Sequence, residues 1–248
     1  MENRPMTSSP AISFYTTVLR PGQELAKTHA TLAAAAGEFP YEHVVSVAEK
    51  FETLPEFIPG RPPNLKLVSA PKSSISEGFN VAIRACSAPL IMVANAGDRI
   101  LDATPLVKVL QSQPRADFAY GDILLNGKRV GGRPSPLSPW SLYLHGMGFC
   151  HGACATRRDF HDRYGYYDPA FRISMDFAVF MSAVARGAVM AKVPDLISDI
   201  EAPGNSSQRL ERTLDNYRVI RRHLPRSMAL PIAAKWLLAS WLGELARK

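Results

Sequence analysis

The sequence predicts an α/β protein in which a mostly parallel sheet is flanked by helices and followed by a helical C-terminal extension. In the first hundred residues, apolar strand-like runs alternate with amphipathic helical runs, which is typical of a helix-covered parallel sheet. The chain has 248 residues, of which 46% are hydrophobic, enough for one large core. Ligands of such sheets bind outside the carboxyl ends of the strands. The residues that follow each strand are therefore the first candidates for chemistry.

The first half supplies its elements in a regular order. Apolar runs bounded by turn residues predict strands at residues 11–18, 43–47, 65–69 and 90–94. Pro21 begins a helix that ends at Gly37, and a second helix is expected at residues 77–86. Four prolines between residues 54 and 63 predict a loop there.

The second half is less regular. A helix with Pro105 in its first turn is expected to be capped by Asp102 or Thr104. Asn126-Gly127 predicts a hairpin turn between strands. The further expected elements are a hairpin of 117–125 with 128–131, a loop at 131–139, helices at 157–164 and 175–186, and short strands near Val189 and Ile197. These elements complete a first unit at residues 1–207, and a basic and apolar helical extension fills residues 208–248.

Composition narrows the classes of partner. The net charge of +7 suits nucleic acid, an anionic bilayer or a phosphorylated small molecule. Because no zinc-finger spacing, RNA-binding motif or helix-turn-helix pattern is present, nucleic acid is not an expected partner. Residues 1–10 lack the apolar segment of a secretory signal, and the only cysteines are Cys86, Cys150 and Cys154. Such sparse cysteines predict reduced thiols and a cytoplasmic location.

Two aspartates are candidates for transfer chemistry. Asp98 follows a buried strand in V-A-N-A-G-D, where a carboxylate can hold a divalent cation against a diphosphate or simply cap a turn. Asp176 begins a predicted helix in S-M-D-F, where it can accept a proton as a general base or stabilise the helix dipole.

Two further residues allow more than one interpretation. His151 stands between Cys150 and Cys154, which allows a metal cluster, but zinc sites usually pair Cys-x-x-Cys with a second pair. A histidine that lines a pocket or is simply buried is the better hypothesis. Asp122, in A-Y-G-D-I, fits a turn role and a ligand-facing role equally well.

Taken in order, these segments resemble a family 2 glycosyltransferase of bacterial polysaccharide and glycolipid biosynthesis. Residues 69–98 resemble the family pattern S-E-P-D-x-G-I-Y-D-A-M-N-x-G-I, followed by an apolar strand and N-S-D-D. F-C-H-G-A, an Arg pair, G-Y-Y-D and S-M-D-F then follow in the family's order. Y-G-D at residues 120–122 and G-N-S-S at residues 204–207 also match in position, so the resemblance covers about residues 11–207.

The resemblance implies a GT-A fold, a nucleoside-diphosphate sugar donor, a Mg²⁺ or Mn²⁺ ion and an inverting transfer onto an unidentified acceptor. Asp98 falls on the metal ligand and Asp176 on the catalytic base. Ser74 and Asn80 fall in the segment that approaches the donor, and Thr17 and Glu49, at the ends of the first two strands, complete the expected donor set. Asp122 and His151 are expected on the acceptor side.

The sequence also departs from the family pattern. Gly97 replaces the aspartate before Asp98, and Ala48 stands where a nucleotide-contacting aspartate is usual, which leaves Glu49 as the substitute. Two other hypotheses therefore stay open. One is a GT-A-fold binding or partner protein with impaired activity. The other is a nucleotidyltransferase, although L-R-P-G-Q-E after the first strand is poor in the glycine that such enzymes carry there.

The C-terminal extension predicts contact with a membrane surface or with protein. Residues 208–226 are rich in arginine, and residues 228–245 are rich in Leu and Trp. A basic helix followed by an apolar one fits peripheral binding to anionic lipid at the inner face of a membrane, where a lipid-linked acceptor would lie. Packing on the catalytic unit or across a homodimer axis is equally compatible.

Overall fold

A computed structural model describes residues 9–49, 54–58, 60, 62–70, 74–201 and 209–245. Its strands are β1 (Ile12–Val18), β2 (Tyr41–Val47), β3 (Leu65–Ser69), β4 (Leu90–Val93), β5 (Arg99–Ile100), β6 (Phe118–Leu125), β7 (Lys128–Val130), β8 (Cys154–Arg157) and β9 (Met190–Ile200). Its helices are α1 (Gln23–Ala36), α2 (Leu54–Phe57), α3 (Ile75–Ala85), α4 (Thr104–Ser112), α5 (Pro139–His145), α6 (Phe160–Tyr164), α7 (Met175–Ala185), α8 (Arg209–Arg221) and α9 (Arg226–Leu245), with a 3-10 turn η2 (His151–Ala153).

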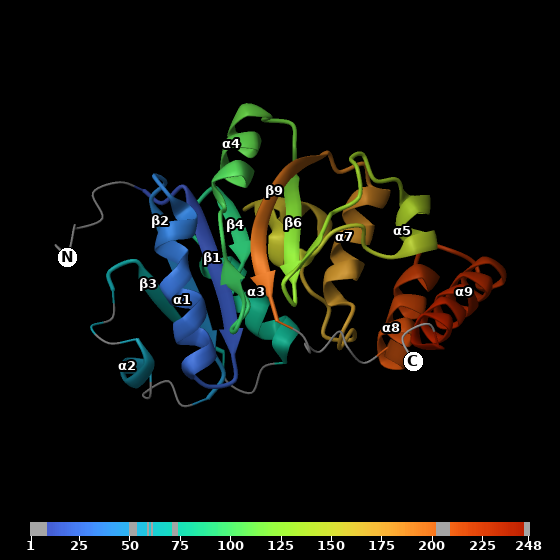
Figure 1. Cartoon of the computed structure of the whole chain (residues 1–248), viewed down its shortest axis with the longest axis horizontal. Helices are drawn as coiled ribbons and strands as arrows, with labels where there is room; N and C mark the ends of the chain where they lie inside the picture. The colour runs from blue at the N-terminus through green and yellow to red at the C-terminus, as the bar shows by residue number, and fades with distance from the viewer. Residues whose placement is uncertain are drawn as a thin grey trace.

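The described strands form one sheet in the order β3-β2-β1-β4-β8-β6-β9-β5, and β7 pairs with β6. Figure 1 shows β3, β2 and β1 toward one end of the molecule and β6 and β9 nearer its middle. Strands β1, β2, β3 and β4 run parallel. β8 is antiparallel to both of its neighbours, β4 and β6, so β6 runs in the same direction as β4, and β9 runs parallel to β6. The carboxyl ends of β1, β2, β4 and β6 therefore meet at one edge of the sheet, as the predicted α/β architecture requires.

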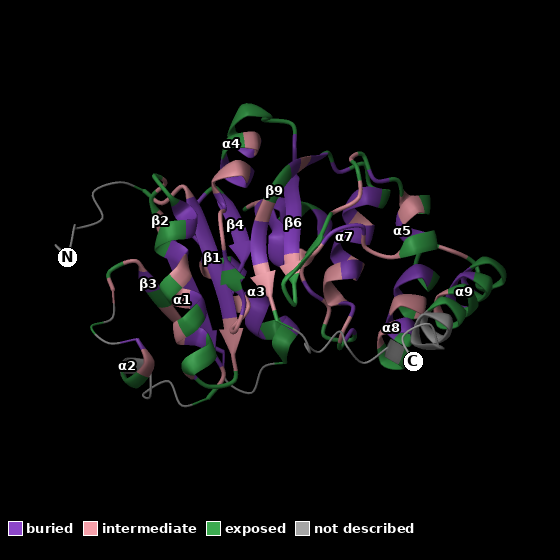
Figure 2. Ribbon diagram, viewed as in Figure 1, coloured by how far each residue is buried: buried purple, intermediate pink, exposed green. Residues whose placement is uncertain are grey.

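Helices cover both faces of this sheet, and Figure 2 shows its strands buried between them. On one face, α1 and α4 pack against the sheet through Leu32 and Leu106. On the other face, α3, α6 and α7 form a larger aromatic core that includes Phe79, Phe160 and Phe180. The buried residues of α1 recur at helical spacing, which places Leu25, Thr28, Leu32 and Ala36 on the face toward the sheet.

Helices α8 and α9 lie at the end of the molecule opposite β3 (Figure 1) and share the core of the α7 face. Ile220 and Ala229 are fully buried there. The indole N–H of Trp236 donates to the Leu144 carbonyl at 3.0 Å, and buried Asp215 accepts from the Ile173 N–H at 2.9 Å. Part of the extension is therefore packed. The expected unit boundary at residue 207 falls among residues 202–208, outside the described part.

Several sequence expectations are confirmed and others corrected. The hairpin forms as predicted, with Asn126 at φ 50° and Gly127 at φ 74°, the left-handed pair that a type I′ turn needs. Residues 54–57 are helical, not loop. The helix expected at 157–164 begins only at Phe160, because Arg157 is the last residue of strand β8 (Cys154–Arg157), which the sequence did not predict. The expected loop at 131–139 is followed at once by a helix that the sequence reading did not anticipate, α5, and the two short late strands are one strand, β9.

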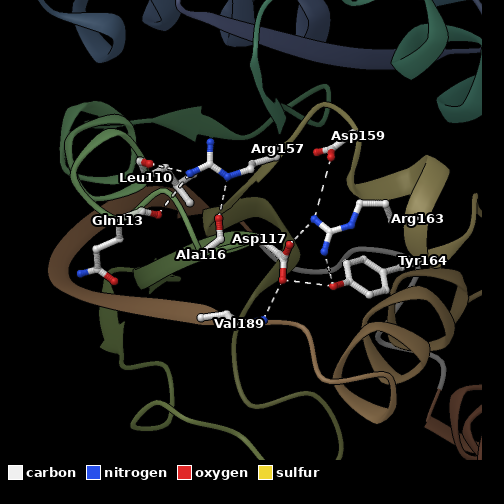
Figure 3. A network of polar contacts seen from close by, with 9 residues as sticks. All are labelled: Leu110, Gln113, Ala116, Asp117, Arg157, Asp159, Arg163, Tyr164 and Val189. Atoms are coloured by element: carbon white, nitrogen blue, oxygen red, sulfur yellow. Dashed lines mark hydrogen bonds and ion pairs between the residues drawn. The ribbon is translucent and has the colours of Figure 1, made fainter.

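Strand β8 was missed because its residues carry no alternating pattern. Cys154, Ala155 and Thr156 are all buried, since β8 is an interior strand covered on both faces. Arg157, at its end, is partly buried and donates to the carbonyl oxygens of Leu110, Gln113 and Ala116, which lie at the end of α4 and beyond it (Figure 3). A four-residue strand of small residues cannot be told from helix by periodicity.

A polar network fixes the edge of the sheet opposite the carboxyl ends (Figure 3). Asp117, just before β6, is 4% exposed and forms an ion pair with Arg163 on α6. It also accepts from the Tyr164 hydroxyl at 3.1 Å and the Val189 N–H at 2.8 Å. One carboxylate thereby joins β6, α6 and the start of β9, which sets the position of the chain that leads to α7.

Candidate active site

The turn after β4 places Asp98 at the carboxyl edge. The Thr28 hydroxyl on α1 lies 3.0 Å from the Asn95 carbonyl and 2.8 Å from the Asp98 carbonyl, and it accepts the Gly97 N–H. Asp98 is 8% exposed, and its Oδ2 accepts from the Asn95 amide at 2.9 Å. Burial raises the pKa of Asp98; the Asn95 hydrogen bond opposes this shift, and the Asp199 carboxylate adds to it. No cationic side chain of the described residues pairs with Asp98.

The backbone conformation at position 97 explains why glycine stands where the family pattern has an aspartate. Its φ is 101°, in the region that favours glycine. A Cβ at this position would lie 3.1 Å from Glu24 Oε2. The Glu24 carboxylate thus occupies the space beside the missing aspartate, and sequence reasoning did not single it out. In the sequence, Glu24 is distinguished only as an acidic residue in the first turn of the helix that follows β1.

Asp176 lies in the first turn of α7. It accepts the Phe177 N–H at 2.7 Å and no hydrogen bond from any side chain of the described residues. Part of the residue reaches solvent, but the packing around the carboxylate excludes enough water to raise the pKa of Asp176 to about 6. Both sequence interpretations therefore remain compatible with the geometry. The residue stabilises a helix terminus, and its protonation lies in the range that a general base needs.

Residues 150–152 lie near both of these carboxylates. A Cβ on Gly152 would lie 3.4 Å from Asp98 Oδ2, and the Ser198 hydroxyl on β9 holds the Gly152 carbonyl. Burial raises the pKa of the Cys150 thiol to about 11, and the charges of both Asp176 and Asp98 contribute to this shift. The segment is therefore within electrostatic reach of both aspartates, which come from residues 78 positions apart in the chain.

His151 lies in the same segment, against two tyrosines. Its Nε2 is 2.7 Å from the Tyr167 hydroxyl and 3.4 Å from the Tyr15 hydroxyl. Burial, with a smaller contribution from His161, lowers the pKa of His151 to about 3. Among the described residues, no three His, Cys, Asp or Glu side chains are grouped to hold a metal ion, so the hypothesis of a cysteine–histidine metal cluster is wrong.

Four of the residues expected to bind the sugar donor have polar atoms that already contact other protein groups or lie at the surface. The Asn80 amide makes two hydrogen bonds with the Tyr167 backbone, at 2.8 and 2.9 Å. Ser74 forms a capping box with Glu77 at the start of α3. Thr17 packs so closely on α3 that a Cβ on Gly78 would lie 2.1 Å from its Oγ1. Glu49 is exposed and pairs with Arg20 at 3.6 Å. Their donor contacts stay predictions.

Asp122 lies apart from this group, on β6. Its carboxylate pairs with Arg129 at 2.7 Å and Lys192 at 3.5 Å, and it accepts the Gly132 N–H at 3.0 Å. Burial acts to raise the pKa of Asp122, but these contacts outweigh burial and hold it below its usual range. This arrangement favours the turn role, because the charge is already compensated.

A surface pocket of about 200 Å³ lies elsewhere, between α3 and α6. Arg84, Arg158, Asp159 and Tyr166 line it. It contains none of the residues expected to bind the donor or the acceptor. The chemistry of the two desolvated carboxylates, rather than this pocket, defines the candidate site.

Solved structures share this architecture. The Staphylococcus aureus TarS fragment 1-349 superposes with a TM-score of 0.62 at 15% identity, covering 91% of this chain and 70% of that one. The Pyrobaculum calidifontis mannosyltransferase PcManGT, solved with GDP-Man and Mn²⁺, gives 0.63 at 15%, covering 95% and 76%. Glucosyl-3-phosphoglycerate synthase from Mycobacterium tuberculosis, solved with Mn²⁺, UDP and phosphoglyceric acid, gives 0.59 at 15%, covering 88% and 80%.

These likenesses show that the chain has the GT-A fold of glycosyltransferases. No protein-family model matches the chain, and no curated protein matches it in sequence. The expected fold is thus confirmed, while membership of family 2 and of its bacterial polysaccharide type stays a prediction.

Proposed function

We propose that this protein is an inverting glycosyltransferase that uses a nucleoside-diphosphate sugar. The observation that carries the proposal is the placement of Asp98 and Asp176, two desolvated carboxylates of raised pKa, around residues 150–152 at the carboxyl edge of the sheet. Neither has a cationic partner among the described residues. Two of the similar structures named above contain GDP-Man or UDP, which supports a nucleotide-sugar donor here.

In the proposed reaction, Asp176 accepts the proton of an acceptor hydroxyl as its oxygen attacks the anomeric carbon. The new bond joins that oxygen to the carbon, and the bond from the carbon to the diphosphate oxygen breaks. The nucleoside diphosphate leaves with the electron pair. Direct displacement with one base inverts the anomeric centre, so the stereochemistry of the product tests the role of Asp176 independently.

The carboxylate of Asp98 is a suitable ligand for a divalent cation. A buried carboxylate of raised pKa without a positive partner is a favourable ligand, and Mg²⁺ commonly uses one or two carboxylates together with substrate phosphates. Mn²⁺ is present in two of the similar structures. Asp98 would hold the ion. Glu24, beside Gly97 and paired with Lys27 at 2.8 Å, is a candidate for a second carboxylate. When bound, such an ion neutralises charge on the departing diphosphate.

The experiment is a thermal-shift screen with UDP, GDP, UDP-GlcNAc and GDP-mannose, with and without Mn²⁺. A donor at a hundredfold excess over its Kd should raise the Tm by about 5–10 °C. Asp98→Asn should abolish the part of this shift that requires Mn²⁺, because it removes a ligand charge. Asp199→Asn, the matched control, removes a neighbouring charge and should keep the Mn²⁺ dependence. An undiminished response in Asp98→Asn contradicts the metal assignment.

A binding or partner protein with impaired activity is the second candidate. Gly97 at φ 101° and the internally engaged Ser74 and Asn80 favour it. Such a protein should give the thermal shift but no release of nucleoside diphosphate with any acceptor. The nucleotidyltransferase hypothesis has no specific structural observation in its favour.

A lipid-linked acceptor would give the C-terminal helices a role at the inner face of a membrane. No helix of the described residues has the length and apolarity to cross a bilayer. Leu230, Leu237 and Leu238 on α9 are at least 40% exposed, and Trp140 on α5 is 51% exposed. The arginines of α8 add positive charge beside this apolar surface. Together these features favour peripheral binding to anionic lipid. The alternative partner for the surface is a second copy of the chain.

Full-length protein should float with vesicles that contain anionic lipid and not with purely zwitterionic ones. Leu238→Ser should weaken flotation, because it removes an apolar contact that is 56% exposed in the free protein. Val189→Ser, at 48% exposure on another part of the surface, is the matched control and should float normally. Absence of lipid-dependent flotation, with a concentration-dependent dimer in sedimentation, favours the second copy instead.

A further inference from the structure

The side chain of His151 belongs to a closed set of polar groups. Its Nε2 contacts the hydroxyls of Tyr167 and Tyr15 at 2.7 and 3.4 Å, and these hydroxyls are 2.9 Å apart. Each tyrosine is only 2% exposed. Neither hydroxyl has another hydrogen-bond partner among the described residues. The two hydroxyls therefore depend on one another and on His151.

Counting hydrogens fixes the form of the imidazole ring. If Nε2 carried a hydrogen, the three groups would hold three hydrogens but only the two phenolic oxygens as acceptors. Because two hydroxyls cannot donate to each other at once, one buried O–H would then lack an acceptor, which native proteins avoid. If Nε2 carries a lone pair, Tyr15 donates to Tyr167 and Tyr167 donates to Nε2. Both hydroxyls are then satisfied.

The other ring nitrogen, Nδ1, must then carry the hydrogen. Burial lowers the pKa of His151 to about 3, which keeps the ring neutral near pH 7. Among the described residues, Thr156 Oγ1 is the one buried side-chain nitrogen or oxygen without a partner. His151 Nδ1 also has no hydrogen-bond partner there, and the residue is only partly buried, so Nδ1 remains available to donate to a ligand. His151 lies between Gly152, which adjoins Asp98, and Cys150, which is within electrostatic reach of Asp176.

The geometry points to His151 as a specificity-determining residue: Tyr15 and Tyr167 hold it as the Nδ1–H tautomer, which donates to a sugar hydroxyl bound between Asp98 and Asp176. This inference rests on the proposed function, since it assumes that a sugar occupies this place. A neutral N–H group can donate to a sugar hydroxyl, whereas a charged imidazolium would pair with the diphosphate instead. The hydroxyl belongs to the transferred sugar or to the acceptor sugar.

The first measurement needs no ligand. Long-range ¹H–¹⁵N spectra of full-length protein labelled at histidine should show the Nδ1–H pattern for His151 at pH 7, assigned by its loss in His151→Asn. The double variant Tyr15→Phe/Tyr167→Phe removes both hydroxyls and should abolish the tautomer preference. An Nε2–H pattern or an imidazolium in the wild-type protein overturns the inference, whether or not the protein is a glycosyltransferase.

The second measurement identifies the source of the hydroxyl. UDP-GlcNAc and GDP-mannose are compared with free N-acetylglucosamine and mannose. Movement of the Nδ1–H signal with a nucleotide sugar assigns the transferred sugar, and movement with a free sugar alone assigns the acceptor. No movement with any of the four overturns the sugar contact. Thermal shifts by UDP and GDP in the same samples report separately on the proposed function.

Kinetics separate a sugar contact from a packing role. With the sugar identified above, His151→Phe should raise the KM for that substrate by about tenfold, the value of one lost hydrogen bond, and leave the KM of the other substrate unchanged. His151→Asn carries an amide N–H close to the position of Nδ1–H and should recover most of the loss. Equal effects of both variants on both substrates contradict the assignment.

Discussion

Replacing Asp176 with asparagine is expected to lower kcat by about 10²–10⁴-fold, the usual contribution of a general base. The Kd of the donor should change little, because the amide keeps the shape of the side chain and removes only its basicity. The reaction is followed as release of nucleoside diphosphate with the donor found by thermal shift. Unchanged turnover in the variant would remove Asp176 from the mechanism.

The pH profile of the same reaction adds a second readout. The pKa of Asp176 is about 6 because burial disfavours its charged form, and the base acts only as the carboxylate. The wild-type kcat should therefore fall as pH decreases through about 6 and reach a plateau above it. Asp102→Asn is the matched control. The Asp102 carboxylate also accepts a backbone N–H at the start of a helix, that of Thr104 at 2.9 Å, but this helix is α4. Its kcat and profile should match the wild type.

Acidification from pH 6.5 to 4.5 is expected to reduce the free energy of unfolding by roughly 4–5 kcal/mol. Burial lowers the pKa of His43 and His151 to about 3 and that of His161 to about 4. These rings stay neutral in the folded protein but bind protons in the unfolded chain below about pH 6.5. Their contribution is therefore complete above that pH and is lost as the pH falls.

Carboxyl groups modify this loss in opposite directions. Asp176 and Asp98 have raised pKa values and bind protons more readily when folded, which offsets part of the effect of the histidines. Glu42 has a lowered pKa because four hydrogen bonds to its Oε1, from Ser13, Ser87 and Ala88, outweigh its burial. The stability that Glu42 contributes is lost only as the pH falls below the ordinary pKa of a glutamate. Because the losses at the buried histidines exceed the gains at the two aspartates, the net change between pH 6.5 and 4.5 remains a loss.

Urea unfolding at several pH values measures this dependence. His161→Asn is the informative variant, because an amide N–H can replace the ring Nδ1, which lies 3.1 Å from the Gly165 carbonyl, without titrating. The slope of unfolding free energy against pH should then decrease by up to about 1.4 kcal/mol per pH unit. An identical slope in the variant and the wild type would show that His161 titrates normally in the fold.

Local patterns in the sequence were sufficient for most of the fold. The alternation of apolar strands and one-faced helices gave β1, α1, β2, β3, α3 and β4 within two residues, because each pattern reflects contacts with a nearby sheet. Asn126-Gly127 specified its hairpin because few other residues accept left-handed backbone. Strand β8 and helix α5 were missed, since short buried segments have no such signal.

The sequence by itself determined which residue types stand at the ends of the strands, and it singled out Asp98, Asp176 and His151. Only the tertiary structure decided what surrounds them. It joined Asn80 to the Tyr167 backbone across 87 positions, set Glu24 beside Gly97 and enclosed His151 with two tyrosines. The physical reason is that desolvation and hydrogen-bond partners come from chain segments far apart in sequence, which meet only when the sheet and its helices have packed.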